Sequence, residues 1–113
     1  MDQWLTEGFE ATGVTALLIQ NDRAAIGAID SLRLHGIRVP EDVSIIGFDG
    51  TDECELCRPR LTSVEVPLQQ VGAAAVELLL RHVKGESKAQ ERVILPTRLK
   101  VRDSTAPPGR RGK

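Results

Sequence analysis

The chain has few aromatic residues and few cysteines, and neither charge sign dominates it. Phe and Trp make up 3% of its 113 residues and Tyr is absent, so any core must be aliphatic. Two cysteines are too few for a disulfide framework, and a reducing, cytoplasmic setting is therefore expected. With 15 basic and 16 acidic residues the net charge is −1, which argues against the basic surface of a nucleic-acid binder.

Long apolar runs are also lacking. No stretch approaches the roughly 18 apolar residues that a membrane span requires, and the acidic start of the chain is unlike a secretory leader. We therefore expect no membrane partner and no signal peptide. The 41% of apolar residues still suffices for one globular domain, or for part of a larger one.

Two short apolar runs define the expected fold. Residues 14–20 and 43–48 are aliphatic without alternation, which is typical of strands buried on both faces of a parallel sheet. Between them, apolar residues recur on one helical face: Ala25, Ala28, Ile29 and Leu32. Strand–helix–strand units are almost always right-handed and have parallel strands. The pattern predicts an α/β fold, with a Rossmann-like parallel sheet flanked by helices.

The remaining segments predict smaller elements. Residues 3–11 favour a short helix, and residues 67–84 favour a longer amphipathic helix that begins at Pro67. Residues 50–61 are polar and irregular. Strands are expected at 62–66, 93–95 and 97–102, and a disordered tail at 107–113. The folded unit would thus span residues 1–106.

Polar residues stand where the two buried strands end. Asn21 and Asp22 follow the first strand, and Asp49 ends the second. Parallel strands place their carboxyl ends on one edge of the sheet, which is where open α/β sheets bind ligands. Asp22 is also well placed to cap the helix that follows it. The alternative for all three residues is that they only end strands and cap helices.

These segments resemble the Lac repressor family of sugar-responsive repressors. The resemblance is carried by residues 19–22 with 25–28, and most specifically by Gly36-Ile-Arg-Val-Pro-Glu-Asp-Val-Ser-Ile-Ile-Gly-Phe-Asp49. It continues through residues 59–64, Gly72 and residues 102–107. It implies the carboxyl-terminal part of a two-lobed, periplasmic-binding-protein-like type I core. The 67–84 helix would belong to the other lobe, and DNA would bind only through a helix-turn-helix region absent from this chain.

The resemblance also assigns roles to individual residues. Asn21 and Asp49 match positions that contact a small-molecule effector, here expected to be a sugar, whose hydroxyls suit an amide and a carboxylate. Asp22 matches a more often structural position. Val66 departs from the Gln that many members carry, which removes one polar contact.

A homodimer interface is implied as well. The candidate interface residues are Ile26, Ile29, Arg33 and Leu56. For Ile29 the alternative is that it faces the sheet. No cofactor and no metal site are expected, because Cys54 and Cys57 lack further ligands nearby in sequence and Gly47-x-x-Gly50 lacks the dinucleotide fingerprint.

The sequence thus predicts a non-enzymatic sensing module of a transcriptional regulator. A ligand between the lobes would stabilise one closure angle by population shift. Two alternatives remain open: a fragment of a periplasmic-type sugar-binding transport protein, and a small enzyme using Asp49 as an acid or base. Because contacts from the other lobe are absent, we expect weak sugar binding by this chain alone. The leucine face of the 67–84 helix would have to fold back, exchange with a second copy, or dimerise.

Overall fold

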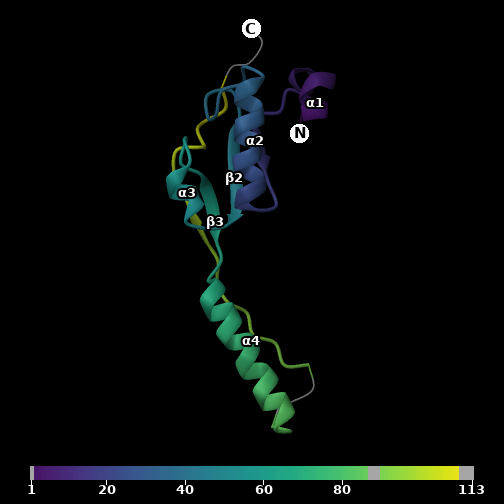
Figure 1. Cartoon of the computed structure of the whole chain (residues 1–113), viewed down its shortest axis with the longest axis vertical. Coiled ribbons are helices and arrows are strands. Elements are labelled where there is room, and N and C mark those ends of the chain that lie inside the picture. The colour runs from purple at the N-terminus through teal and green to yellow at the C-terminus, as the bar shows by residue number, and fades with distance from the viewer. Residues whose placement is uncertain (1, 87–89, 110–113) are drawn as a thin grey trace.

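The computed structural model describes residues 2–86 and 90–109, and its centre is a four-stranded sheet in the order β1-β2-β3-β4. The first three strands are mutually parallel, and the fourth is antiparallel to the third. The strands are β1 (Ala16–Leu18), β2 (Ser44–Asp49), β3 (Thr62–Glu65) and β4 (Arg98–Lys100). Helix α2 (Asp22–Leu34) connects β1 to β2 and covers one face of the sheet (Figure 1). The predicted α/β class is confirmed.

Three further helices and one 3-10 turn complete the described chain. They are α1 (Asp2–Glu7), η1 (Phe9–Thr12), α3 (Glu53–Leu56) and α4 (Leu68–Val83). The expected 3–11 helix is thus divided into α1 and η1. The short α3 lies in the segment expected to be irregular. Of the expected tail, residues 107–109 have no regular structure, and 110–113 lie outside the described residues.

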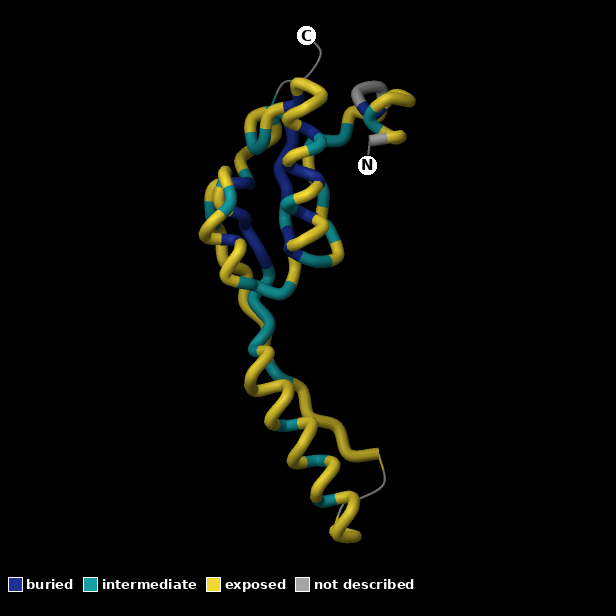
Figure 2. Tube along the Cα trace, viewed as in Figure 1, coloured by how far each residue is buried: buried dark blue, intermediate teal, exposed yellow. Residues whose placement is uncertain are grey.

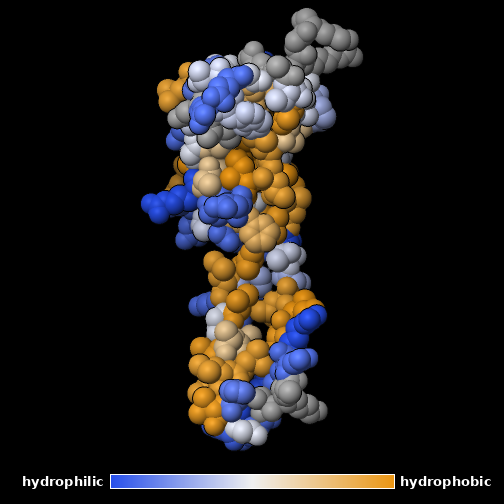
Figure 3. Space-filling view, turned by 90° about the vertical axis from the view of Figure 1, so that its right-hand side faces the viewer, coloured by the Kyte–Doolittle hydropathy of each residue, from blue (hydrophilic) through white to orange (hydrophobic). Residues whose placement is uncertain are grey.

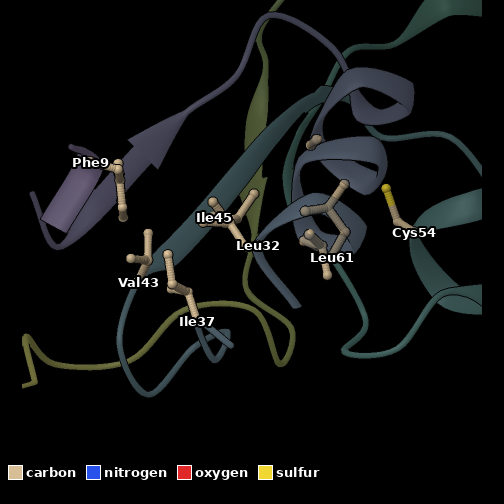
Figure 4. Close-up of a cluster of buried hydrophobic side chains, with 9 residues drawn as sticks. Phe9, Leu32, Ile37, Val43, Ile45, Cys54 and Leu61 are labelled. Carbon is tan, nitrogen blue, oxygen red and sulfur yellow. The ribbon is translucent and has the colours of Figure 1, made fainter. Parts of the chain in front are cut away.

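The core lies between α2, the sheet and the amino-terminal turn, as Figure 4 shows. Its buried members are Phe9, Ala25, Ile29, Leu32, Ile37, Val43, Ile45, Cys54 and Leu61. The α2 stripe read from the sequence faces this core. Phe9 adds an aromatic ring that Trp4 contacts edge-on, with the ring centroids 4.7 Å apart. Apart from Phe9, the core is built of small and aliphatic side chains and one cysteine.

Two strand predictions need correction. The run 14–20 forms a strand only over Ala16–Leu18, and Leu18 is 71% exposed because β1 lies at the sheet edge and is not covered on both faces. Residues 93–95 form no strand, because they run along α4 instead of beside β3 (Figure 1). The last strand keeps only Arg98–Lys100 of the expected 97–102, and all three residues are exposed.

Helix α4 extends away from the sheet, which gives the molecule extents of 64 × 26 × 21 Å (Figure 1). None of its residues is buried (Figure 2). Its apolar side chains, with those of Val93 and Ile94, form an exposed hydrophobic region in the lower half of Figure 3. Across residues 2–86 and 90–109, no helix combines the length and the apolarity that crossing a membrane demands.

Candidate functional site

A cleft of about 730 Å³ opens at the carboxyl edge of the sheet. Its lining comes from two segments, the β1–α2 junction and the β2–α3 loop. The lining residues are Asn21, Asp22, Arg23, Ala24, Asp49, Thr51, Asp52 and Glu53. The structure therefore brings together Asn21, Asp22 and Asp49, as the parallel strand–helix–strand unit predicts.

Asn21 caps α2, and the expectation that Asp22 does so is wrong. Asn21 has extended backbone angles, and its Oδ1 accepts a hydrogen bond from the Ala24 backbone N–H at 2.8 Å. The helix begins one residue later, so Asp22 already belongs to its first turn and its side chain is directed elsewhere. The amide nitrogen of Asn21 makes no hydrogen bond within the described part of the chain and remains available to a ligand.

Asp22 is a buried carboxylate, 1% exposed, that joins three segments. Its Oδ2 accepts hydrogen bonds from the Thr51 backbone N–H at 2.7 Å and the Thr51 hydroxyl at 3.0 Å. Its Oδ1 accepts one from the Ser63 hydroxyl at 2.5 Å. Burial raises the pKa of Asp22, but hydrogen bonds led by that from Ser63 outweigh burial and leave the pKa below its ordinary value. Asp22 is therefore held ionised at the floor of the cleft.

Gly47 makes room for this carboxylate. A Cβ at position 47 would lie 2.5 Å from Asp22 Oδ1 and 2.8 Å from Leu61 Cδ2. Both distances are too short for a side chain, so β2 needs glycine where α2 approaches it. The glycine thus marks a place where two elements approach each other closely.

Asp49 has an unusual backbone conformation. Its φ is 115°, in a region that favours glycine and costs other residues free energy. The Asp49 carbonyl accepts a hydrogen bond from the Val66 N–H at 3.1 Å, which ties it to β3. Within the described residues, its carboxylate has no hydrogen-bond or ion-pair partner. Asp49 thus combines a strained backbone with a carboxylate that the described part of the fold does not use.

Four lining residues were not identified from the sequence: Arg23, Thr51, Asp52 and Glu53. Arg23 is exposed and, among residues 2–86 and 90–109, has no ion-pair partner. Its guanidinium could donate hydrogen bonds to a ligand and offset the acidic side chains of the cleft. The only sequence signal for Arg23 was its position directly after Asn21-Asp22.

Val66 is not part of this cleft. It lines a separate apolar hollow between the start of α4 and the returning segment, together with Pro67, Val71, Val93 and Leu95. The difference from the Gln of many family members therefore concerns a position away from the described lining.

The two cysteines lie in surroundings that favour a structural role over a reactive one. Cys54 is fully buried in the core, and burial, with Asp22 nearby, raises the pKa of its thiol to about 11. The Cys57 thiol donates to the carbonyls of Cys54 and Pro59, and burial raises its pKa as well. Thiols with raised pKa values are poor nucleophiles and poor metal ligands at neutral pH. In the described residues, no cluster of three metal-ligating side chains occurs.

The expected interface residues divide into two groups. Ile29 is 4% exposed and packs in the core, so the alternative, that it faces the sheet, is correct. Leu56 on α3 is 78% exposed, and Arg33 is exposed and paired with Asp30 at 2.9 Å. Ile26 is half-buried beside the core. Ile26, Arg33 and Leu56 thus remain candidates for contact with a partner.

Comparison with known proteins identifies the class that this architecture and cleft define. The model of the periplasmic binding protein-like domain matches residues 1–105. The chain belongs to this family, and the resemblance to the Lac repressor family is confirmed.

Related regulators and solved structures support this assignment. The chain is 43% identical over 93 residues to the HTH-type transcriptional regulator DegA of Bacillus subtilis, covering 82% of this chain and 28% of DegA. It is 40% identical to catabolite control protein A of Priestia megaterium, covering 80% of this chain and 27% of that protein. A LacI family regulator from Enterococcus faecalis with bound ribose matches with a TM-score of 0.83 and 38% identity, over 94% of this chain and 39% of that one.

A second structure of the same kind has a different sugar. The LacI family regulator from Arthrobacter, in complex with lactose, matches with a TM-score of 0.76 and 36% identity, over 90% of this chain and 39% of that one. The chain thus spans less than a third of the length of these curated relatives.

Proposed function

We propose that this chain is part of the effector-sensing core of a Lac repressor family transcriptional regulator, and that its cleft binds a sugar or a related polyhydroxyl metabolite. The observation that carries the proposal is the pairing of Asn21 and Asp49. Both line the cleft, and each has polar atoms that the fold does not use. The lactose and ribose in structures of similar regulators support a sugar.

The chemistry of the pair suits an uncharged ligand with many hydroxyls. A carboxylate accepts hydrogen bonds from two adjacent hydroxyls, while the Asn21 amide nitrogen can donate to a hydroxyl or ring oxygen. The strained φ of Asp49 supports a binding role, because an unused carboxylate gives the fold no reason to retain strain. The curated relatives are transcriptional regulators, which supports a non-enzymatic role.

The cleft has one wall. All of its lining residues come from residues 21–24 and 49–53. A ligand held from one side retains much of its contact with water, so binding by this chain alone should be weak. We propose that α4 belongs to the other lobe of the complete core. Its entirely unburied apolar face supports this assignment.

The same proposal includes the partners expected from the sequence. Closure of the two lobes on a ligand would shift the population between two geometries of a homodimer. Ile26, Arg33 and Leu56 are proposed to lie in the dimer contact. DNA would be bound by a helix-turn-helix region outside this chain, in the cytoplasm. The curated relatives are regulators, which favours this function over a fragment of a transport protein.

Ligand-observed saturation-transfer NMR would test the proposal. Ribose, lactose and other neutral sugars would be screened beside amino acids and nucleobases at millimolar concentration, a regime in which weak binding is still detected. We expect signals from at least one neutral sugar and their loss in Asp49→Ala. Asp103→Ala is the matched control, because Asp103 pairs with Arg60 and does not line the cleft.

Two results would contradict the proposal. One is binding only of compounds without vicinal hydroxyls, and the other is sugar binding that survives Asp49→Ala unchanged. Micromolar affinity of the unmodified chain would contradict the inference that a ligand is held from one side only and therefore binds weakly.

A further inference from the structure

We infer that Asp22 is a positioning residue for Asp49: through Thr51 and Ser63 it holds the β2–α3 loop in the conformation that directs Asp49 into the cleft. The inference rests on the proposed function of the cleft, because it assigns the group that shapes the ligand-binding side of the site. Asp22 itself would not bind the ligand.

The first observation is that the loop is fastened to Asp22 directly after Asp49. The backbone N–H and the hydroxyl of Thr51 both donate to Asp22 Oδ2, at 2.7 and 3.0 Å. The Gly50 N–H donates to the Ser63 hydroxyl at 3.2 Å, and that hydroxyl donates to Asp22 Oδ1 at 2.5 Å. Both residues that follow Asp49 are thus bonded, directly or through Ser63, to one buried carboxylate.

The second observation is that this loop has a conformation it would not adopt without support. The strain lies at Asp49, whose φ is 115°, whereas the φ of 77° at position 50 is one that glycine adopts freely. A Cβ at position 50 would lie 2.8 Å from Glu65 Cα, so the loop passes close against β3. Such conformations persist only where the surrounding structure fixes them. Before the loop, the Val66 N–H donates to the Asp49 carbonyl. After the loop, Asp22 holds Thr51 through its backbone N–H and its hydroxyl.

The third observation concerns charge. An ionised carboxylate is a pure acceptor, and all three groups that face Asp22 in these bonds are donors. The Asn side chain has nearly the same shape but only one acceptor oxygen, and its NH2 group only donates. In either orientation the charge is lost, and either Thr51 or the Ser63 hydroxyl can no longer donate to residue 22 as it does to Asp22. Asp22→Asn therefore weakens one branch of the network with little change in volume.

Two variants and a matched control test the inference. Asp22→Asn and Ser63→Ala each disrupt the network, and Asp30→Asn removes an exposed carboxylate on α2 that pairs with Arg33 and does not line the cleft. The readouts are the three-bond HN–Hα coupling of Asp49, which reports φ, the amide proton shifts of Gly50 and Thr51, and the affinity for the sugar found by saturation transfer.

We expect both network variants to change the Asp49 coupling and the two amide shifts. If the binding conformation falls to about a tenth of the population, sugar affinity falls about tenfold. The amide shifts of β1 and of the start of β2 should stay as in the unmodified chain, and Asp30→Asn should change none of the three readouts.

Unchanged coupling and amide shifts in a folded Asp22→Asn variant would overturn the inference. Should that variant fail to fold, Ser63→Ala decides, since it leaves the Asp22 charge and its two Thr51 bonds in place. If the unmodified chain binds no sugar, the proposed function fails, while the coupling and shifts still decide whether Asp22 positions Asp49.

Discussion

Helices α2 and α4 are both amphipathic, yet only α2 buries its apolar face. Leu32 of α2 is fully buried, whereas Leu79 of α4 is 60% exposed. Helix α4 is also the more apolar of the two. The difference lies in what each helix faces. Helix α2 packs on β2, whereas α4 lies against the short returning segment around Val93 and Leu95 and buries none of its residues.

This comparison separates two kinds of information in the sequence. The spacing of apolar residues predicts that a helix has one apolar face, and both helices form where that spacing predicts them. The spacing does not predict which other part of the protein packs against that apolar face. A helix of this length gains most of its stability from tertiary packing, and the proposal that α4 belongs to the other lobe supplies the contact that its exposed face lacks here.

The largest expected effect separates the two helices directly. Leu32→Ala should lower the free energy of unfolding by about 2–5 kcal/mol, because it leaves a cavity in a packed core. Leu79→Ala should change it by less than about 0.5 kcal/mol, as surface substitutions do. Urea unfolding of both variants would measure the difference. Equal losses would mean that α4 is covered in solution by a second copy.

A smaller effect concerns the Asp22 network. Asp22→Asn should lower the free energy of unfolding at neutral pH by about 1.5–3 kcal/mol, the range for hydrogen bonds to a charged group. The pKa of Asp22 is lowered from 3.8 in the folded state, so its ionised form stabilises the fold above that pH. The contribution is lost as the pH falls through the folded pKa.

The gap between wild type and Asp22→Asn should therefore close on acidification. Urea unfolding at a series of pH values would record it. Glu55 and Asp103, whose pKa values are lowered chiefly by Arg102 and Arg60, are present in both proteins and cancel in the comparison. A gap that stays constant down to strongly acidic pH would show that the Asp22 charge does not stabilise the fold.

The smallest effect is expected on the α4 side. Arg81 pairs with Glu91 at 2.8 Å and links α4 to the returning segment. Both side chains are partly exposed, so Glu91→Ala should cost less than about 1 kcal/mol. Amide hydrogen exchange would detect faster opening of the last turns of α4, with β2 unaffected. Equal acceleration of exchange in β2 would mean that α4 and the sheet unfold as one unit.

Much of the fold could be predicted because it follows from local patterns. The apolar runs gave β1 and β2, the helical stripe gave α2, and the parallel crossover placed Asn21 beside Asp49. The error about the cap arose because two adjacent polar residues, Asn21 and Asp22, can each cap a helix, and only the buried contacts of Asp22 with Thr51 and Ser63 decide between them.

Other features depend on contacts that sequence spacing does not encode. Residues 93–95 have strand-like composition, but their neighbour is α4 rather than β3, so no ladder forms. Leu18 belongs to an apolar run, yet it lies on an edge strand. The positive φ of Asp49 is set by the turn that follows β2, and Arg23 lines the cleft because it stands in the first turn of α2.

The central claim is that Asn21 and Asp49 form one wall of a sugar site. Amide chemical-shift mapping during titration with the neutral sugar selected by saturation transfer tests it most directly. We predict shifts concentrated at residues 21–24 and 49–53, with millimolar affinity, and their loss in Asp49→Ala but not in Asp103→Ala. Shifts confined to the apolar hollow beside Val66 would contradict the proposed site.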